Sequence, residues 1–183
     1  MPPKVKITRD MILDAAFRLV REEGHQALTA RRLAAALGCS TQPILYQFSS
    51  VDEIVRETYQ RADEYHTRYL TDGLENEEVP LLALGLRYIR FGAEEKPLFR
   101  FLFQSGHFSG DLVADMAGSP DALRMAGMVA QASGLDPDAA LKVFRALFTS
   151  VHGYASLLAN NAMDWQSAQA EEILTMLLEG LSK

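Results

Sequence analysis

The stretch that most constrains this chain is residues 29–48, which read TARRLAAALGCSTQPILYQF. Leu33 and Leu37 recur at helical spacing, so the first part predicts a short helix with one apolar side. Gly38 follows where helices commonly end in a left-handed residue. Pro43 suits the first turn of a second helix, where its missing N–H is not needed. Two short helices joined by a glycine-containing turn form a helix-turn-helix, whose second helix can enter the DNA major groove.

The flanking residues support this motif. Ser40 or Thr41 can cap the second helix by accepting a backbone N–H. Ile44 and Phe48 fall on one side of that helix and predict its buried face. Upstream, residues 8–23 predict an amphipathic helix ended by Gly24, on which the two short helices would pack.

A set of residues between positions 8 and 54 matches a known DNA-binding head. The matching residues are Ile12, Leu13, Asp14, Ala15, Ala16, Gly24, Thr29, Arg31, Leu33, Ala34, Leu37, Gly38, Ser40, Phe48, Asp52, Glu53 and Ile54. Through them the segment resembles the tetracycline-repressor (TetR) family of transcriptional regulators. Two positions depart from the family pattern, because Leu45 and Val51 stand where many members have tyrosine and lysine. Both family residues usually meet the DNA backbone, so their absence leaves fewer phosphate partners.

The motif predicts double-stranded DNA as a partner and a set of DNA-binding residues. They are Arg31, Arg32, Ser40, Thr41, Gln42, Leu45, Tyr46 and Gln47. Gln42 or Gln47 could pair with adenine edges, and Leu45 could touch a thymine methyl. The two arginines are better placed for phosphates. Tyr46 fits either a partly buried anchor or a phosphate contact.

The net charge of −6 is unevenly distributed. Residues 1–50 hold seven Lys and Arg against four Asp and Glu, a net +3, which leaves −9 for the remainder. A basic head on an acidic body suits a protein that presents one end to a polyanion, although an ordinary scatter of solvated charges would look similar.

The rest of the chain predicts an all-α body, for about nine helices in total. Ser50 and Glu53 are spaced as a capping box that starts a long helix. Further starts are marked by Pro80, Pro97, Ser119–Pro120 and Asp136–Pro137. We therefore expect a helix-turn-helix DNA-binding domain over 1–50 and a helical ligand-binding and dimerisation domain over 51–183.

Aromatic residues concentrate in residues 97–110 and suggest burial, either in a packed core or around a cavity. The alternate spacing of Phe99, Phe101 and Phe103 would also fit a strand, but Pro97 and the helical surroundings favour a helix. The resembled family encloses a small-molecule pocket in its body, which implies an effector of unknown identity. The candidate pocket residues are Phe99, Phe103, Phe108, Met125, Met128, Phe148 and His152. His152 fits a pocket hydrogen bond or a satisfied interior histidine equally well.

The last two predicted helices carry more apolar surface than a small body needs, which favours a homodimer through a four-helix interface. The resembled family dimerises through these helices, and Val151–His152–Gly153 is similar to a motif of one subgroup. The candidate interface residues are Leu147, Val151, Tyr154, Leu158, Ile173, Leu174, Leu177 and Leu181.

Other function classes have little support. Cys39 is the only cysteine, which excludes an internal disulfide. We find no phosphate loop, zinc pattern or nucleophile elbow, and we expect no cofactor, no metal and no enzymatic activity. No apolar run reaches the length of a membrane span, so a cytoplasmic protein is expected.

We therefore expect a DNA-binding transcriptional regulator, a repressor released from a palindromic operator by a small-molecule ligand. Two alternatives remain open at this stage. One is a helical small-molecule-binding protein or enzyme with a vestigial DNA-binding motif, and the other is an architectural DNA binder with little sequence preference.

Overall fold

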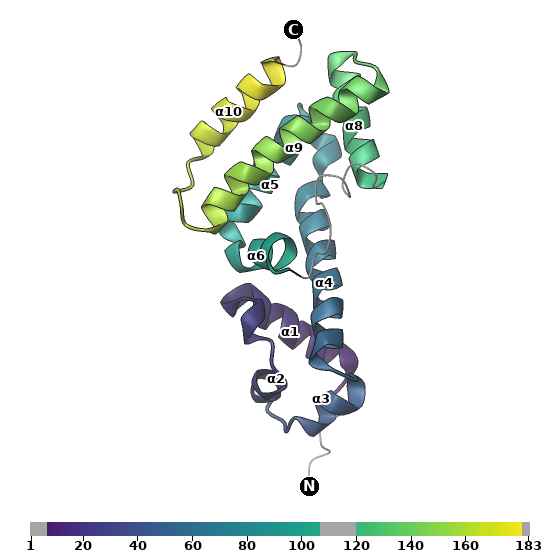
Figure 1. Ribbon diagram of the computed structural model, residues 1–183, viewed down its shortest axis with the longest axis vertical. Helices are drawn as coiled ribbons and strands as arrows, with labels where there is room; N and C mark the ends of the chain where they lie inside the picture. Colours follow the sequence, from purple (N-terminus) through teal and green to yellow (C-terminus); the bar gives the residue numbers. More distant parts are fainter. Residues whose placement is uncertain (1–6, 107–119, 181–183) are drawn as a thin grey trace. The chain divides into compact units, whose positions relative to one another are not determined.

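The structure is a computed structural model that describes residues 7–106 and 120–180. This part of the chain holds nine α-helices, two short 3₁₀ helices and no strand, in agreement with the all-α prediction (Figure 1). The helices are α1 (Arg9–Glu23), α2 (Ala30–Ala36), α3 (Gln42–Gln47), α4 (Val51–Thr71), α5 (Pro80–Glu94), α6 (Lys96–Gln104), α8 (Pro120–Ser133), α9 (Pro137–Ala159) and α10 (Ser167–Gly180).

The chain forms two compact units. The first comprises Met1–His66 and Pro97–His107, and the second comprises Thr67–Lys96 and Phe108–Lys183. The first unit therefore contains α1 to α3, most of α4 and most of α6. The expected division into a DNA-binding domain over 1–50 and a ligand-binding and dimerisation domain over 51–183 stays a prediction.

Helix α1 begins and ends at the residues that the sequence marks. The Thr8 hydroxyl accepts the backbone N–H of Met11 at 3.3 Å, and Gly24 ends the helix with a φ of 88°. The apolar face of α1 is buried and includes Ile12, Ala16 and Val20. This face is the surface on which α2 and α3 pack.

The helix-turn-helix has the predicted turn at Gly38. The Thr29 hydroxyl caps α2 by accepting the N–H of Arg32 at 3.2 Å. Gly38 adopts a φ of 63°, which favours glycine, and lets the chain turn into α3. The predicted cap of α3 is right in position but wrong in chemistry. Thr41 occupies the cap, but its hydroxyl makes no capping hydrogen bond, because its backbone is already near-helical.

Helix α4 starts at the predicted capping box with one difference. Glu53 donates its backbone N–H to the Ser50 hydroxyl at 3.1 Å. Its carboxylate, however, accepts from the backbone N–H and hydroxyl of Ser49, both at 2.7 Å, rather than from Ser50. The carboxylate thus orders the last residues before the helix as well as its first turn.

Residues 96–104 form helix α6, so the strand alternative for this aromatic stretch is wrong. Phe99 and Phe101 are fully buried inside the first unit. The Tyr59 hydroxyl of α4 donates to the carbonyl oxygen of Leu102 at 3.0 Å. Burial and the charge of Asp63 raise the pKa of Tyr59, which keeps this hydroxyl protonated as a donor.

The second unit is built on α5, which packs against both α9 and α10. Gly92 of α5 meets Ala155 of α9 so closely that an added Cβ would lie 2.6 Å from the Ala155 carbonyl oxygen. Only glycine allows this approach at Gly92, so the crossing of the two helices depends on it. Helix α9 begins at Asp136, whose carboxylate accepts the N–H groups of Asp138 and Ala139 at 3.1 and 3.0 Å, and it also packs against α8.

Candidate nucleic-acid interface and ligand pocket

Helix α3 presents three side chains to solvent. Ile44 is fully buried and Phe48 is nearly so, which fixes the inner side of the helix. Tyr46 is 80% exposed and Leu45 is 58% exposed, and Gln42 is exposed as well. An amide, an aliphatic group and a phenol together supply hydrogen bonds and apolar contact for base edges or phosphates.

Gln47 is placed differently from Gln42, although the sequence made them equal candidates. Its side chain is half-buried, and Nε2 donates to the carbonyl oxygen of Ile7 at 3.3 Å. The amide thereby ties the segment before α1 to the end of α3. Gln42 is therefore the more accessible of the two side-chain amides.

The remaining candidate DNA contacts are also exposed. Arg31 and Arg32 lie at the start of α2, and Ser40 and Thr41 lie in the turn before α3. Arg32 forms an ion pair with Glu23, because its Nη2 lies 2.5 Å from Glu23 Oε1. Both side chains are largely exposed, and an exposed pair of this kind contributes at most about 1 kcal/mol. Arg32 could therefore exchange Glu23 for a phosphate at little cost.

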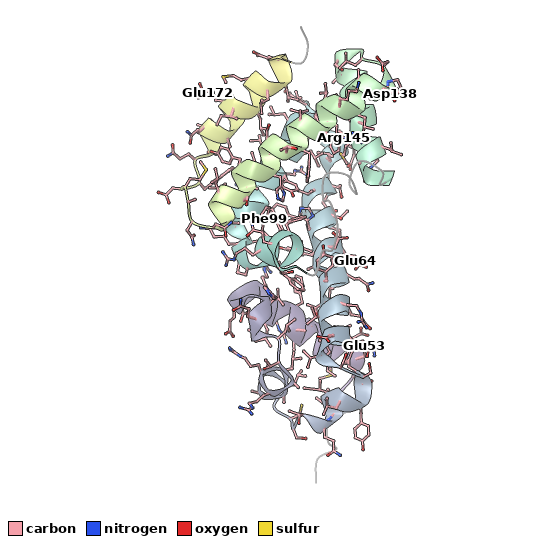
Figure 2. The ribbon with its side chains drawn as sticks, viewed as in Figure 1. Glu53, Glu64, Phe99, Asp138, Arg145 and Glu172 are labelled. Carbon is pink, nitrogen blue, oxygen red and sulfur yellow. The ribbon has the colours of Figure 1, made fainter. Side chains whose placement is uncertain are left out.

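An arginine that the sequence did not single out joins the ends of α1, α3 and α4. Arg9 donates to the carbonyl oxygen of Gln47 and to the carboxylates of Glu53 and Glu57, and its guanidinium carbon lies 4.0 Å from the centroid of the Phe48 ring. Figure 2 labels Glu53 at the start of α4. The hydrogen bonds from Arg9 and Ser49 lower the pKa of Glu53 from 4.5 to about 2. No periodicity in the sequence signals this contact, since the partners lie 38 to 48 positions apart.

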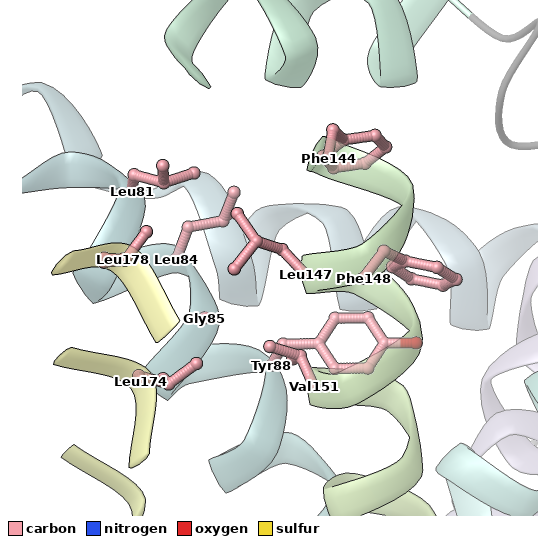
Figure 3. Close-up of a pocket in the computed structure, with 10 residues that line it drawn as sticks. All are labelled: Leu81, Leu84, Gly85, Tyr88, Phe144, Leu147, Phe148, Val151, Leu174 and Leu178. Atoms are coloured by element: carbon pink, nitrogen blue, oxygen red, sulfur yellow. The ribbon is translucent and has the colours of Figure 1, made fainter. Parts of the chain in front are cut away.

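The second unit contains an apolar cavity of about 70 Å³ between α5, α9 and α10 (Figure 3). Its lining residues are Leu81, Leu84, Gly85, Tyr88, Phe144, Leu147, Phe148, Val151, Leu174 and Leu178. The space depends partly on Gly85, because a Cβ there would lie 3.1 Å from Leu174 Cδ1. The lining carries no charged group, so an uncharged apolar molecule is the chemistry it suits.

Comparison with protein families shows to which family this helix-turn-helix and helical body belong. The family model described as "Tetracyclin repressor-like, C-terminal domain" matches residues 81–181, which is more than half of the chain. The model described as "Bacterial regulatory proteins, tetR family" matches residues 12–58. The chain belongs to the TetR family. It is therefore a DNA-binding transcriptional regulator, in a family of ligand-responsive regulators.

A solved structure agrees with this TetR fold. It is a crystal structure of a TetR variant from Acinetobacter baumannii AYE in complex with minocycline, and the chain is similar to it with a TM-score of 0.55 and 21% identity. The match covers 97% of this chain and 95% of that one. At this identity the likeness shows the fold alone. No curated protein matches the chain significantly.

The pocket residues predicted for this TetR regulator do not gather around one cavity. Phe148 lines the apolar cavity, and the nearby Nδ1 of His152 lies 2.9 Å from the Tyr88 hydroxyl. Burial lowers the pKa of His152, which favours a neutral ring that accepts this hydrogen bond. Phe99 and Phe103 belong instead to the first unit, where their rings pack together with centroids 4.9 Å apart. Phe99 is a buried core residue there, Phe103 is half-buried, and neither lines this cavity.

The other three pocket candidates add no wall to the cavity. Met125 and Met128 lie half-exposed on α8, and Phe108 lies outside the described residues. The wall contributed by α5 was not predicted from the sequence. Its signal was a second apolar stripe in that helix, with Leu81, Leu84, Gly85 and Tyr88 at helical spacing.

The predicted dimer-interface residues also divide into two groups. Leu147, Val151, Leu158 and Leu174 are buried within the protomer, so they are unsuitable as contacts to a second copy. Tyr154, Ile173 and Leu177 are half-exposed, and Leu181 lies outside the described residues. The exposed large apolar residues of α9 and α10 are Leu157 and Met176, at 50% and 62% exposure. The prediction chose helices that do expose apolar side chains, but periodicity alone could not say which apolar stripe faces inward.

Two further properties concern only the described part of the chain. No group of His, Cys, Asp and Glu side chains there could hold a metal ion. None of its helices is both long enough and apolar enough to span a bilayer.

The lowered pKa of Glu53 predicts a specific acid sensitivity. Because its folded-state pKa of about 2 lies below 4.5, its contribution to stability is fully present above pH 4.5 and is lost as the pH falls towards 2. We expect the urea midpoint of the wild-type protein to fall more steeply over this pH window than that of Glu53→Gln. Glu64→Gln, an exposed position on the same helix, is the control and should follow the wild type. If the urea midpoints of the wild type and Glu53→Gln fell in parallel with pH, the lowered pKa of Glu53 would be contradicted.

Proposed function

We propose that this TetR-family protein is a homodimeric repressor that binds a palindromic operator through α3 and is released by a small apolar ligand. The observation that carries the proposal is the outward display of Gln42, Leu45 and Tyr46 on a helix whose other side is fixed by Ile44 and Phe48. A rigid helix that exposes base-reading groups is what direct readout requires. Regulators of this family are generally non-enzymatic, so no catalytic activity is assigned. The protein would act in the cytoplasm, where bacterial DNA lies.

Gln42 would read a base edge, Leu45 would contact a thymine methyl, and Tyr46 would contact a phosphate. Arg31, Arg32 and the N-terminus of α3 would add phosphate contacts. Two such heads would occupy neighbouring major grooves about 34–36 Å apart along the duplex, so the operator would be a palindrome.

The exposed side of α9 and α10 would form the dimer contact. Leu157 and Met176 provide the apolar centre, and exposed Ser150 and Gly153 permit close approach of helices. The homodimer is what places two reading helices on one duplex, and symmetric dimers use the same patch on both copies.

The cavity between α5, α9 and α10 would receive the effector. Ligand pockets commonly measure about 300–1,000 Å³, so a cavity of about 70 Å³ admits only a small hydrocarbon group unless its wall moves. Leu174 and Leu178 of α10 form the wall that a larger ligand would displace. Such a ligand would favour the state with the wider cavity through unequal affinity for the two states.

The base-reading role of Gln42 predicts a loss of specificity on truncation. Gln42→Ala should weaken binding to a duplex selected by the wild type from a random pool by about 1–3 kcal/mol, the worth of one bidentate base contact. Binding to a scrambled duplex should not change. Gln131→Ala, at an exposed position of α8, is the matched control and should bind both duplexes like the wild type. Equal losses on both duplexes, measured by fluorescence anisotropy, would argue against base reading by Gln42.

The proposed interface predicts that a charge at Leu157 dissociates the dimer. Leu157→Glu should shift the protein to monomers in sedimentation experiments, because a desolvated carboxylate without a partner is costly. Leu123→Glu on α8 is the matched control, since Leu123 is 57% exposed. The control should remain dimeric. A dimeric Leu157→Glu protein, or a monomeric control, would place the interface elsewhere.

The cavity predicts a response to a small apolar probe. Toluene should raise the thermal midpoint, by an amount equivalent to about 1.4 kcal/mol at ten times its dissociation constant, and should weaken binding to the selected duplex. Leu84→Trp should abolish both effects, because Leu84 lines the cavity and a larger side chain there would fill it (Figure 3). Leu123→Trp, at an exposed position of α8, should retain both toluene effects. Undiminished toluene effects in Leu84→Trp would exclude this cavity as the effector site.

A further inference from the structure

Arg9 holds the C-terminal end of α3 from a different helix. Its Nη1 donates to the carbonyl oxygen of Gln47, the last residue of α3. The last carbonyls of a helix have no partner within the helix, and a cation there also interacts favourably with the helix dipole. The guanidinium lies 4.0 Å from the centroid of the Phe48 ring, which directly follows α3. Arg9 thus contacts the end of α3 through both its backbone and its buried aromatic residue.

The same guanidinium is oriented from the opposite side by α4. Nη2 donates to Glu53 Oε1 at 2.6 Å, and Nε donates to Glu57 Oε2 at 3.1 Å. Glu53 is itself fixed by the backbone N–H and hydroxyl of Ser49. A planar guanidinium that binds two carboxylates has little rotational freedom. One side chain of α1 therefore links the end of α3 to the start of α4, in addition to the burial of Ile44 and Phe48.

These contacts make Arg9 a poor phosphate partner. All three guanidinium nitrogens donate to protein oxygens. Two carboxylates more than offset its single positive charge, so a phosphate near it would meet net negative charge. The Arg9 side chain is 40% exposed, so water reaches it, but its positive charge is balanced by the two carboxylates.

We propose that Arg9 is a positioning residue for sequence reading, which fixes the angle of α3 so that Gln42 reaches its base without Arg9 touching DNA. The proposal rests on the proposed function of α3. Helix α3 has only six residues, too few to hold its own conformation in water, so its orientation must come from contacts such as these. A tilt of the helix would misalign base contacts while leaving non-specific attraction to phosphates in place.

The test uses the full-length protein and two duplexes, one selected by the wild type from a random pool and one with the same bases scrambled. Arg9→Lys keeps the positive charge but removes the planar fork. We expect its affinity for the selected duplex to fall about tenfold to a hundredfold, and its affinity for the scrambled duplex to change less than about twofold. The dependence of log affinity on log salt should keep its slope, since no phosphate contact is lost. Arg68→Ala, at an exposed position of α4, is the control.

Glu57→Gln is the second variant. For this variant a positioning role of Arg9 and a phosphate-contact role of Arg9 predict opposite changes in affinity. Positioning predicts a loss of affinity for the selected duplex, because Arg9 loses a charged anchor. A phosphate contact by Arg9 predicts an equal or higher affinity, since a nearby negative charge is gone. Circular dichroism at the assay temperature identifies the folded variants, and if Arg9→Lys does not fold, Glu57→Gln carries the test.

The outcomes separate this inference from the proposed function. Wild-type binding that prefers the selected duplex, combined with unchanged selectivity in both variants, would overturn the role of Arg9 alone. A parallel loss on both duplexes in Arg9→Lys would make Arg9 a phosphate contact and also overturn the proposal. A wild type that prefers no duplex would overturn the proposed function and this inference together.

Discussion

The proposed DNA-contact surface of α3 depends on one constraint, which is that α3 is very short. Six residues make less than two turns, and an isolated helix of this length is not stable in water. Helix α3 exists because Ile44 and Phe48 are buried beneath it and because its last carbonyl is satisfied from α1. Once those two side chains point inward, the helical period sends Leu45 and Tyr46 outward. The recognition surface is thus a consequence of how the helix is anchored.

In the second unit, the corresponding constraint is the approach of α5 to α9. Gly92 allows the two helices to touch at Ala155, and Gly85 leaves space beneath Leu174 seven residues earlier. One helix therefore provides both a tight crossing and a cavity. Helix α10 lines one side of that cavity with Leu174 and Leu178 and carries the exposed Met176. A ligand that displaced α10 would act on the same helix that offers apolar surface to a second copy, which gives the proposed effector a direct route to dimer geometry.

The sequence predicted the parts of this structure that depend on neighbouring residues. Asp136 caps a helix as the Asp136–Pro137 pair indicates, and Gly24 and Gly38 end or turn the chain with positive φ. What it could not predict requires knowledge of distant partners. The exposed side of α9 cannot be chosen from its sequence alone, because both Val151 and Leu157 fit an apolar stripe and only tertiary packing buries the first. Arg9 looks like an ordinary solvated charge until residues 38 to 48 positions away come beside it.

The distribution of charge adds a limit on how this regulator can find its site. Residues 1–50 carry a net charge of +3 and the remainder −9, so attraction to DNA is confined to the head. Within the head, Arg9 is neutralised by Glu53 and Glu57, and Arg32 is paired with Glu23. Leu45 and Val51 replace family residues that usually meet the backbone. Because non-specific affinity comes almost entirely from phosphate contacts, the pairing of Arg9 within the protein weakens binding to random DNA. The proposed repressor would then depend on the alignment of a few base contacts for most of its preference, and that alignment is what the anchoring of α3 supplies.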